Sequence, residues 1–322
     1  MNNQDFDNLP NNKEIFESFL VANNKINNTA YKNIACSISG GSDSDIMLDI
    51  CARVDRDKKI KYVFFDTGLE YQATKDHLTY LENKYNIKIY HEKARKSIPI
   101  CNKKYGQPFL SKLVSEFMSR LQKHNFQWED ESYEVLIKKY PNCKSALKWW
   151  CNDKGESSRF NIHQNKGLKD FIIQNPPKFK ISNKCCYYAK KLVAKDFKDN
   201  NDIELSMVGI RKSEGGVRSA AYKNCFTSNS DNVKADEYRP IFWYKNETKE
   251  IYEKEFDVIH SDCYSKYGLK RTGCAGCPYG RDFEFELEVI KEYEPRLYIA
   301  VNNIFRDSYD YTRKYNEFKS KL

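Results

Sequence analysis

The sequence predicts an α/β fold in which a parallel sheet is flanked by helices. Apolar runs typical of buried strands alternate with amphipathic stretches over the first ninety or so residues. A loop rich in glycine and serine joins the first such strand to the helix that follows it. Hydrophobic residues make up 40% of the chain and charged residues 31%, which is an ordinary globular balance. Alternating strands and helices imply a parallel sheet covered by helices.

The predicted elements follow one another in a regular order. Strands are expected over the apolar runs 33–39, 59–67, 87–93 and 204–210. Helices are expected over the amphipathic stretches 14–26, 44–54, 70–86, 184–197, 248–256 and 283–305. Between about 108 and 180 the pattern loosens into lysine-rich and aromatic helical pieces, where Trp149 and Trp150 are interpreted as local core.

These elements predict a single nucleotide-binding core with additions. We expect an N-terminal tail and helix, the first part of the core, a helical insertion, a second part of the core that carries cysteines, and a C-terminal helical arm. Their ranges are 1–29, 30–107, 108–183, 184–282 and 283–322.

Composition excludes several classes of protein. No run approaches eighteen apolar residues, and the first twelve residues lack the basic start and apolar stretch of a secretory signal, so we expect a cytoplasmic protein without a membrane span. The net charge of +9 is compatible with an anionic nucleotide, with nucleic acid or with simple solubility. Eleven cysteines exceed what packing requires in a reducing cytosol, which indicates metal ligands or reactive thiols.

The glycine-rich loop predicts a phosphate site. It lies directly after a strand and before a helix, where backbone amides and the helix dipole favour an anion. Glycine lets the backbone approach the phosphates, serine adds hydroxyl donors, and Asp43 can orient a bound Mg²⁺ or cap the helix. The competing interpretation is a helix cap with a turn. The loop consists of Ser39, Gly40, Gly41, Ser42, Asp43 and Ser44.

Four cysteines form two pairs that can meet at one metal centre. Cys185 and Cys186 are adjacent, and Cys274 and Cys277 form a CxxC turn. Adjacent cysteines cannot easily chelate one zinc ion, whereas an iron–sulfur cluster offers separate iron corners, so an iron–sulfur cluster is favoured over zinc. Cys225 or Cys263 can replace one of the four.

Two arginines lie between the cysteine pairs. Arg211 and Arg218 follow the strand that ends near Gly209, and a guanidinium can fork onto phosphate or sulfate oxygens. The alternative is a solvated helix start in which Glu214 pairs with Arg218.

These motifs resemble one family. The loop SGGSDS resembles the PP-loop of the adenine nucleotide alpha hydrolases, which include ATP pyrophosphatases, tRNA thiolation enzymes and the reductases of adenylyl sulfate and phosphoadenylyl sulfate (PAPS). Many members carry lysine where this chain has Ser42. Residues 63–74 resemble the second strand and following loop of the reductase branch, which implies that Asp66, Thr67 and Glu70 lie near the nucleotide.

The resemblance extends to the second half of the chain. The cysteine pattern resembles the 4Fe-4S site of assimilatory adenylyl-sulfate reductases, and residues 209–218 resemble the arginine motif of the reductases. Residues 239–256 and 267–280 resemble a stretch in which an aromatic-rich strand precedes the cysteine loop, and Lys270 and Arg271 adjoin that loop. The similarity covers about residues 30–95 and 184–282.

The resemblance implies an enzyme that binds ATP or an adenylyl nucleotide and transfers sulfur with an iron–sulfur cluster and Mg²⁺. Asp43, Arg211 and Arg218 are the expected catalytic residues. Partners implied are a sulfur donor or reductant protein and a tRNA or DNA acceptor. The alternatives are an adenylyl-sulfate or PAPS reductase that uses Cys101, Cys225 or Cys263, and a non-catalytic nucleotide- and metal-binding module. The chain ends YTRKYNEFKSKL, without the Glu-Cys-Gly motif that supplies the nucleophile in the reductases.

Overall fold

The computed structural model describes residues 9–28, 31–155, 157–215, 221–228, 235–280 and 282–322. The chain divides into two compact units. The sheet unit comprises residues 1–94 and 190–274, and the helical unit comprises residues 95–189 and 275–322. Each unit is therefore assembled from two separate stretches of the chain.

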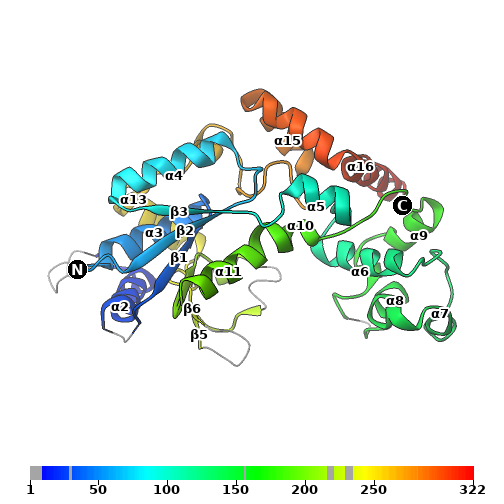
Figure 1. Ribbon diagram of the computed structural model, residues 1–322, viewed down its shortest axis with the longest axis horizontal. Coiled ribbons are helices and arrows are strands. Elements are labelled where there is room, and N and C mark those ends of the chain that lie inside the picture. The colour runs from blue at the N-terminus through cyan, green and yellow to red at the C-terminus, as the bar shows by residue number, and fades with distance from the viewer. Residues whose placement is uncertain (1–8, 29–30, 156, 216–220, 229–234, 281) are drawn as a thin grey trace. The chain divides into compact units, whose positions relative to one another are not determined.

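The sheet unit is built on six strands in the order β3-β2-β1-β4-β6-β5 (Figure 1). Neighbouring strands run parallel, except that β5 is antiparallel to β6. The first strand of the chain lies in the middle, between β2 and β4, so the loop that follows it emerges at the centre of the sheet edge. The strands are β1 (Ile34–Ile38), β2 (Ile60–Asp66), β3 (Ile89–Lys93), β4 (Leu205–Val208), β5 (Phe226–Thr227) and β6 (Asp236–Tyr238).

Most of the helices in the sheet unit pack on one face of the sheet. Alternate strand residues such as Ile34, Cys36 and Met207 point to this face and join one buried core with the apolar sides of the helices. Tyr252 fixes the helix that comes last in the chain among them, α13, because its ring is fully buried and its hydroxyl donates to Asp49 Oδ2 at 2.6 Å. These helices are α2 (Lys13–Asn27), α3 (Ser42–Val54), α4 (Gln72–Tyr85) and α13 (Asn246–Glu255).

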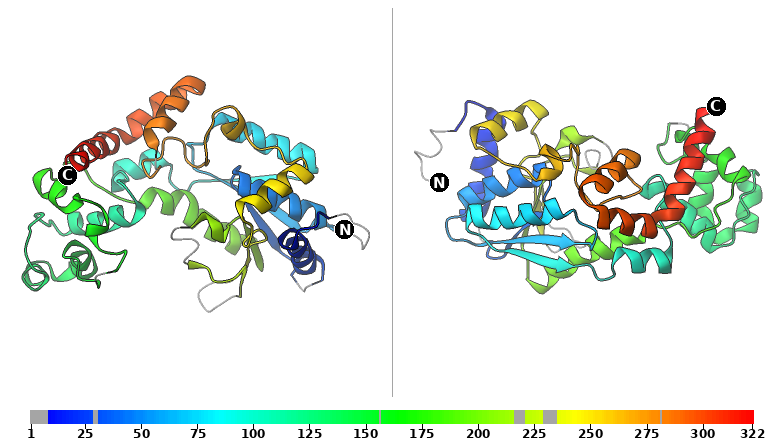
Figure 2. Two further views of the ribbon diagram at one scale, coloured as in Figure 1. Left: turned by 180° about the vertical axis from the view of Figure 1, so that it is seen from behind. Right: turned by 90° about the horizontal axis from the view of Figure 1, so that it is seen from above.

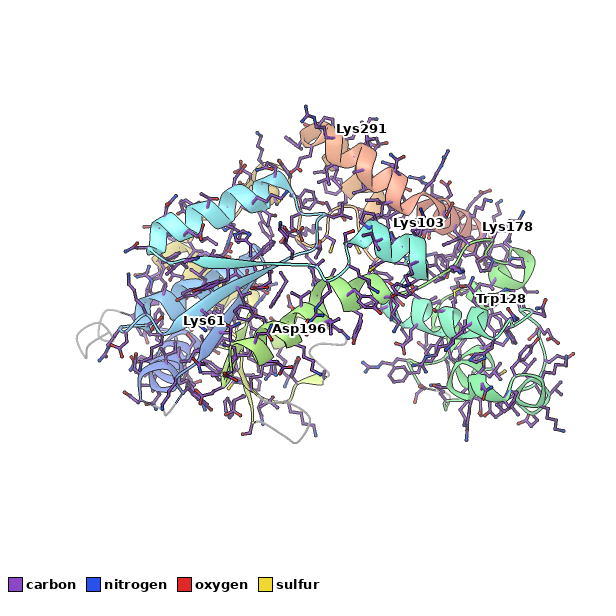
Figure 3. The ribbon with its side chains drawn as sticks, in the orientation of Figure 1. Lys61, Lys103, Trp128, Lys178, Asp196 and Lys291 are labelled. Atoms are coloured by element: carbon purple, nitrogen blue, oxygen red, sulfur yellow. The ribbon has the colours of Figure 1, made fainter. Side chains whose placement is uncertain are left out.

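The opposite face of the sheet is covered by α11 (Leu192–Asn200). Ala35 and Val63 point to this face and pack with Phe197 of the helix. Lys61 of β2 projects to the same side, where its ammonium donates to Asn201 Oδ1 at 2.9 Å (Figure 3). The view from above shows the strands lying between the two helical layers (Figure 2). A sheet covered on both faces is the predicted α/β architecture, and that prediction is confirmed.

The helical unit has its own core. Trp149 and Trp150 are fully buried there among aromatic and aliphatic side chains, as predicted for this pair. Tyr311 and Tyr315 of the last helix belong to the same core, so the C-terminal arm packs with the insertion. The helices are α5 (Ile98–Tyr105), α6 (Lys112–Lys123), α7 (Tyr133–Lys139), α8 (Lys144–Trp150), α9 (Leu168–Gln174), α10 (Lys184–Cys186), α15 (Phe283–Tyr293) and α16 (Pro295–Ser320).

One local prediction is wrong. The resemblance of residues 239–256 implies an aromatic-rich strand before the cysteine loop, but the aromatic residues 239–244 form consecutive turns after β6, with backbone bonds from Phe242 N to Arg239 O and from Tyr244 N to Ile241 O. Phe242 and Tyr244 are buried by these turns rather than by sheet pairing. The run of apolar residues therefore reflects burial and not an extended backbone.

No helix within the described residues is both long and apolar enough to cross a membrane.

Candidate functional site

The phosphate loop leaves the centre of the sheet at the end of β1 and leads into α3. Gly40 adopts a positive φ of 66°, and a Cβ at this position would lie 2.6 Å from Thr74 Cγ2, so glycine is required. Ser44 Oγ closes the turn, because it accepts from the amides of Ser39 and Gly41, each at 3.2 Å, and donates to Gly41 O at 2.8 Å. The loop is thus fixed by its own hydroxyl groups.

Two hydroxyl side chains from later in the chain line the mouth of this loop. The amide of Ser42 donates to Tyr264 Oη at 3.0 Å, and that phenol lies 3.3 Å from Thr272 Oγ1. A Cβ on Gly41 would lie 3.1 Å from Thr272 Oγ1 and 3.3 Å from Tyr264 Oη. A phenol oxygen therefore occupies the position, in front of a helix N-terminus, where an anion would be bound.

Two cations converge on Asp43 in the first turn of α3. Arg211 Nε contacts both carboxylate oxygens, at 3.0 and 2.9 Å, and Lys249 Nζ lies 3.1 Å from Oδ1. Burial would raise the pKa of Asp43, but Lys249 and Arg211 outweigh it and hold that pKa below its ordinary value. The carboxylate is therefore ionised and holds both cations beside the loop.

Arg211 is positioned by a network of side chains. Its Nη1 donates to Ser213 Oγ at 3.1 Å and to Asn246 Oδ1 at 3.0 Å. The preceding Gly209 lies against the loop itself, since a Cβ there would come within 3.0 Å of Asp43 O and 3.1 Å of Ser44 Cα. Residues 209–211 thus contact the phosphate loop directly, and binding of a nucleotide by Gly209 and Arg211 stays a prediction. Arg218 lies outside the described residues.

The predicted residues after β2 mainly bond one another. Glu70 accepts from the Thr67 amide at 3.1 Å and from its hydroxyl at 2.7 Å, and Asp66 accepts from the Gly68 amide at 2.8 Å. Burial raises the pKa of Glu70. These bonds form the turn that leads into α4. A nucleotide contact by Asp66, Thr67 or Glu70 stays a prediction.

A buried acid with two histidines lies behind the loop, and sequence reasoning missed it. Asp45 Oδ2 is 2.8 Å from His260 Nδ1 and 3.0 Å from His77 Nε2, and His260 Nε2 is 2.7 Å from Glu253 Oε1. Burial opposes protonation of His260, but Asp45 and Glu253 outweigh it and raise its pKa to about 9. His260 is therefore cationic at neutral pH. No local pattern signals this network, because its partners are 215 residues apart.

The predicted metal ligands are divided between two segments. Cys185 and Cys186 belong to α10, directly before the π-helical turn Tyr187–Lys191, and π-turns are common at functional sites. Cys277 belongs to the helical unit, whereas Cys274 is the last residue of the sheet unit. No disulfide involves any of the eleven cysteines, all of which lie within the described residues.

The CxxC turn is fixed by the last two helices. Gly276 adopts a φ of 61°, and its amide donates to Glu286 Oε1 of α15 at 3.1 Å. Its carbonyl accepts from the hydroxyl of Tyr309 on α16. A Cβ at Gly276 would lie 2.7 Å from that hydroxyl and 3.0 Å from Val301, so the turn packs closely on α16. The helical arm therefore sets the position of Cys277.

Three of the predicted ligands act on one buried phenol. Burial raises the pKa of Tyr279 far above its ordinary value, and the thiolates of Cys185, Cys186 and Cys277 raise it further. Among the described residues, however, no three His, Cys, Asp or Glu side chains are arranged closely enough to hold one metal ion. The thiol donor set fits an iron–sulfur cluster, and the four-ligand site itself stays a prediction.

Two of the three cysteines considered as reductase nucleophiles are buried. Cys101 is buried, its Sγ lies 3.6 Å from Lys96 O, and burial raises its thiol pKa. Cys263 is fully buried behind the loop, 3.6 Å from Thr74 Oγ1. Cys225 is partly exposed. A reactive thiolate requires exposure and a low pKa, which Cys101 does not have.

Comparison with known proteins supports the predicted family. Residues 33–150 match the phosphoadenosine phosphosulfate reductase domain, a match that includes the phosphate loop, β2 and α4. The match covers 118 of the 322 residues, so it is a similarity of this segment to the PAPS reductase domain.

The chain is also similar to individual proteins. It is 26% identical over 289 residues to an uncharacterized protein of Methanocaldococcus jannaschii, and the match spans 88% of this chain and 43% of that protein. PAPS reductase from Candida auris, solved as a phosphate complex, shares 12% identity with this chain and has a TM-score of 0.45. The alignment covers 85% of this chain and 96% of the reductase chain. The U34-tRNA thiolase NcsA from Methanococcus maripaludis, solved with its [4Fe-4S] cluster, shares 12% identity, covers 100% and 86%, and has a TM-score of 0.39.

Proposed function

We propose that the chain is an ATP-dependent sulfur transferase of the PAPS reductase family. The observation that carries this proposal is the preformed loop Ser39–Ser44 with Arg211 and Lys249 held beside it by Asp43. Loop amides, a helix N-terminus and two cations from other elements form an arrangement suited to a polyphosphate.

The proposed chemistry begins with activation of an oxygen on the acceptor. That oxygen attacks ATP, the bond between the α and β phosphates breaks, and pyrophosphate leaves. A thiolate or persulfide then forms a carbon–sulfur bond while the carbon–oxygen bond breaks and AMP leaves. When the donor is a persulfide, its sulfur–sulfur bond is reduced by two electrons from a thiol or another protein reductant. Mg²⁺ would arrive with the nucleotide, because Asp43 is already engaged by two cations.

An iron–sulfur cluster belongs to the proposal as a second component. Cys185, Cys186 and Cys277 would supply thiolates from the helical unit, and Cys274 is the fourth proposed ligand. The cluster would supply electron transfer or a binding site for sulfur. Tyr279 would keep the surroundings of these thiolates apolar, because its phenol is largely buried.

A nucleic-acid acceptor is supported by charge. The chain has a net charge of +9, and the helical unit contains a cavity of about 320 Å³ whose lining includes Trp128, Lys178 and Lys180 but no acidic residue. An aromatic side chain beside two cations is suited to a base and its phosphates. Replacing both lysines by glutamate should weaken tRNA or DNA binding about 10-fold at low salt. Replacing the exposed Lys103 and Lys104 of α5 by glutamate provides the charge-matched control.

Turnover with different nucleotides tests this proposal. Reduced protein is incubated with ATP, adenylyl sulfate or PAPS, with and without tRNA or DNA, and pyrophosphate and sulfite are assayed. We expect pyrophosphate only from ATP with Mg²⁺ and an acceptor, and no sulfite. Efficient sulfite release would instead establish the reductase alternative, with Cys225 as the more accessible nucleophile. Nucleotide binding without any turnover would favour the non-catalytic module.

A further inference from the structure

Lys249 lies on the face of α13 that points to the phosphate loop. The helix is held in place by its neighbours, because Tyr252 packs on Phe19 and Phe256, with ring centroids 6.1 and 4.4 Å away. One turn along the helix, Glu253 Oε1 lies 3.5 Å from Lys249 Nζ. The side chain of Lys249 is only 16% exposed, so its ammonium has little freedom to leave the loop.

The ammonium contacts the first two residues of α3. It donates to Ser42 Oγ and lies 3.1 Å from Asp43 Oδ1. Cations are usually unfavourable near a helix N-terminus, where the helix dipole is already positive. Here two cations, Lys249 and Arg211, are held at that end by Asp43. Asp43 and Glu253 offset the two positive charges in the absence of a ligand, and an anion bound at the loop would interact favourably with both cations and with the helix N-terminus.

We infer that Lys249 binds the phosphate chain of the nucleotide, as a cation supplied to the loop by α13. The inference rests on the proposed function and adds one residue to its binding site. Ser42 marks the place on the loop where the ammonium acts, since its hydroxyl is the group that Lys249 contacts. Asp43 holds the ammonium in position before the nucleotide binds.

The test is calorimetry with three ligands that carry different parts of ATP. For Lys249→Ala we expect affinity for ATP with Mg²⁺ and for inorganic pyrophosphate to fall about 10-fold to 100-fold, as for loss of a charged hydrogen bond. Adenosine affinity should be unchanged, because the base and ribose do not contact the ammonium. Lys254→Ala, an exposed lysine on the same helix, is the matched control and should bind all three ligands like the wild type.

A second variant distinguishes phosphate binding from structural support. Ser42→Lys combined with Lys249→Ala places an ammonium on the loop itself, and we expect it to recover pyrophosphate affinity to within about 3-fold of the wild type. Unchanged pyrophosphate affinity in Lys249→Ala would overturn the inference. An equal loss for adenosine, or no recovery in the double variant at equal thermal stability, would also overturn it.

Failure of the proposed function gives a different result. Wild-type protein that binds pyrophosphate but not ATP would contradict the proposed function, and the pyrophosphate measurements would still decide the role of Lys249. Wild-type protein that binds neither ligand would overturn both.

Discussion

The phosphate loop and the cysteine turn are positioned in opposite ways. In the sheet unit the loop is fixed before any ligand binds, because Ser44 closes the turn and Asp43 is paired with Arg211 and Lys249. In the helical unit the turn at Gly276 is fixed by Glu286 and Tyr309. The first site is prepared by polar contacts within the protein. The second, as proposed, would be completed only by a bound cluster, so loss of that cluster should affect the helical unit most.

The largest effect is expected for a variant that disrupts only the phosphate loop. Gly41→Val should reduce ATP affinity at least about 100-fold, because its methyl groups would fill the space in front of the loop beside Thr272 and Tyr264. Isothermal titration calorimetry measures it. Gly273→Ala is the control, since a Cβ there meets nothing within 4 Å. Equal affinity of Gly41→Val and wild type, at equal stability, would place the nucleotide elsewhere.

The next largest effect breaks the second site alone. Anaerobically purified protein should be brown and contain about four irons per chain, and Cys277→Ser should lower this below about one. The variant should also melt at a lower temperature while ATP affinity stays unchanged. Cys143→Ser, which alters a buried cysteine in the core of the helical unit, controls for lost packing. Zinc in place of iron in the wild type would contradict the cluster.

The pH dependence of stability tests the buried network of His260 behind the phosphate loop. Because the pKa of His260 rises from about 6.5 in the unfolded chain to about 9, its contribution is complete below pH 6.5 and is lost as pH rises to 9. We expect a loss of at most about 2–3 kcal/mol in the free energy of unfolding over this window. In His260→Gln this pH dependence should disappear.

The control for that titration comes from the helical unit. His163 is exposed, and His163→Gln should keep the wild-type pH dependence. Urea unfolding at pH 6.5 and pH 9 gives the free energy of unfolding of the wild type, His260→Gln and His163→Gln. A wild-type slope that survives His260→Gln would assign the titration to another group.

The smallest expected effects are the stability losses of two helix-cap variants, which test whether the two units unfold together. Asn12 caps α2 in the sheet unit and Ser111 caps α6 in the helical unit, each through a side-chain bond to a backbone amide. Replacing either by alanine should cost about 1 kcal/mol. Calorimetry distinguishes one shared transition, which both variants shift, from two transitions, of which each variant shifts one.

Local sequence patterns were enough to predict strands β1 to β4 and the loop, but not the two short strands β5 and β6. The runs that form β1, α3 and β2 carry strong hydrophobic periodicity, and SGGSDS lies between two of them. The turn at 239–244 was predicted as a strand because burial of Phe242 and Tyr244 produces the same apolar run as a buried strand.

The partners of the loop could not be predicted in the same way. Lys249 lies in the segment TKEIYEKEF, whose pattern predicts a lysine on a solvent-exposed helix face. Tyr264 is one of 23 tyrosines, and nothing in the local sequence distinguishes it from the others. Their contacts join residues 207 and 222 positions apart, and only the folded topology brings them together. Tyr279 had one usable signal, since it lies two residues after the CxxC turn.

The same separations affect how the protein is made. Ser42 leaves the ribosome before Lys249 and Tyr264, which follow more than two hundred residues later. At typical rates of synthesis this delay is roughly ten to forty seconds. During that time the nascent chain presents the loop without the ammonium or the phenol. The proposed binding site can therefore be complete only after Tyr264 has been synthesised.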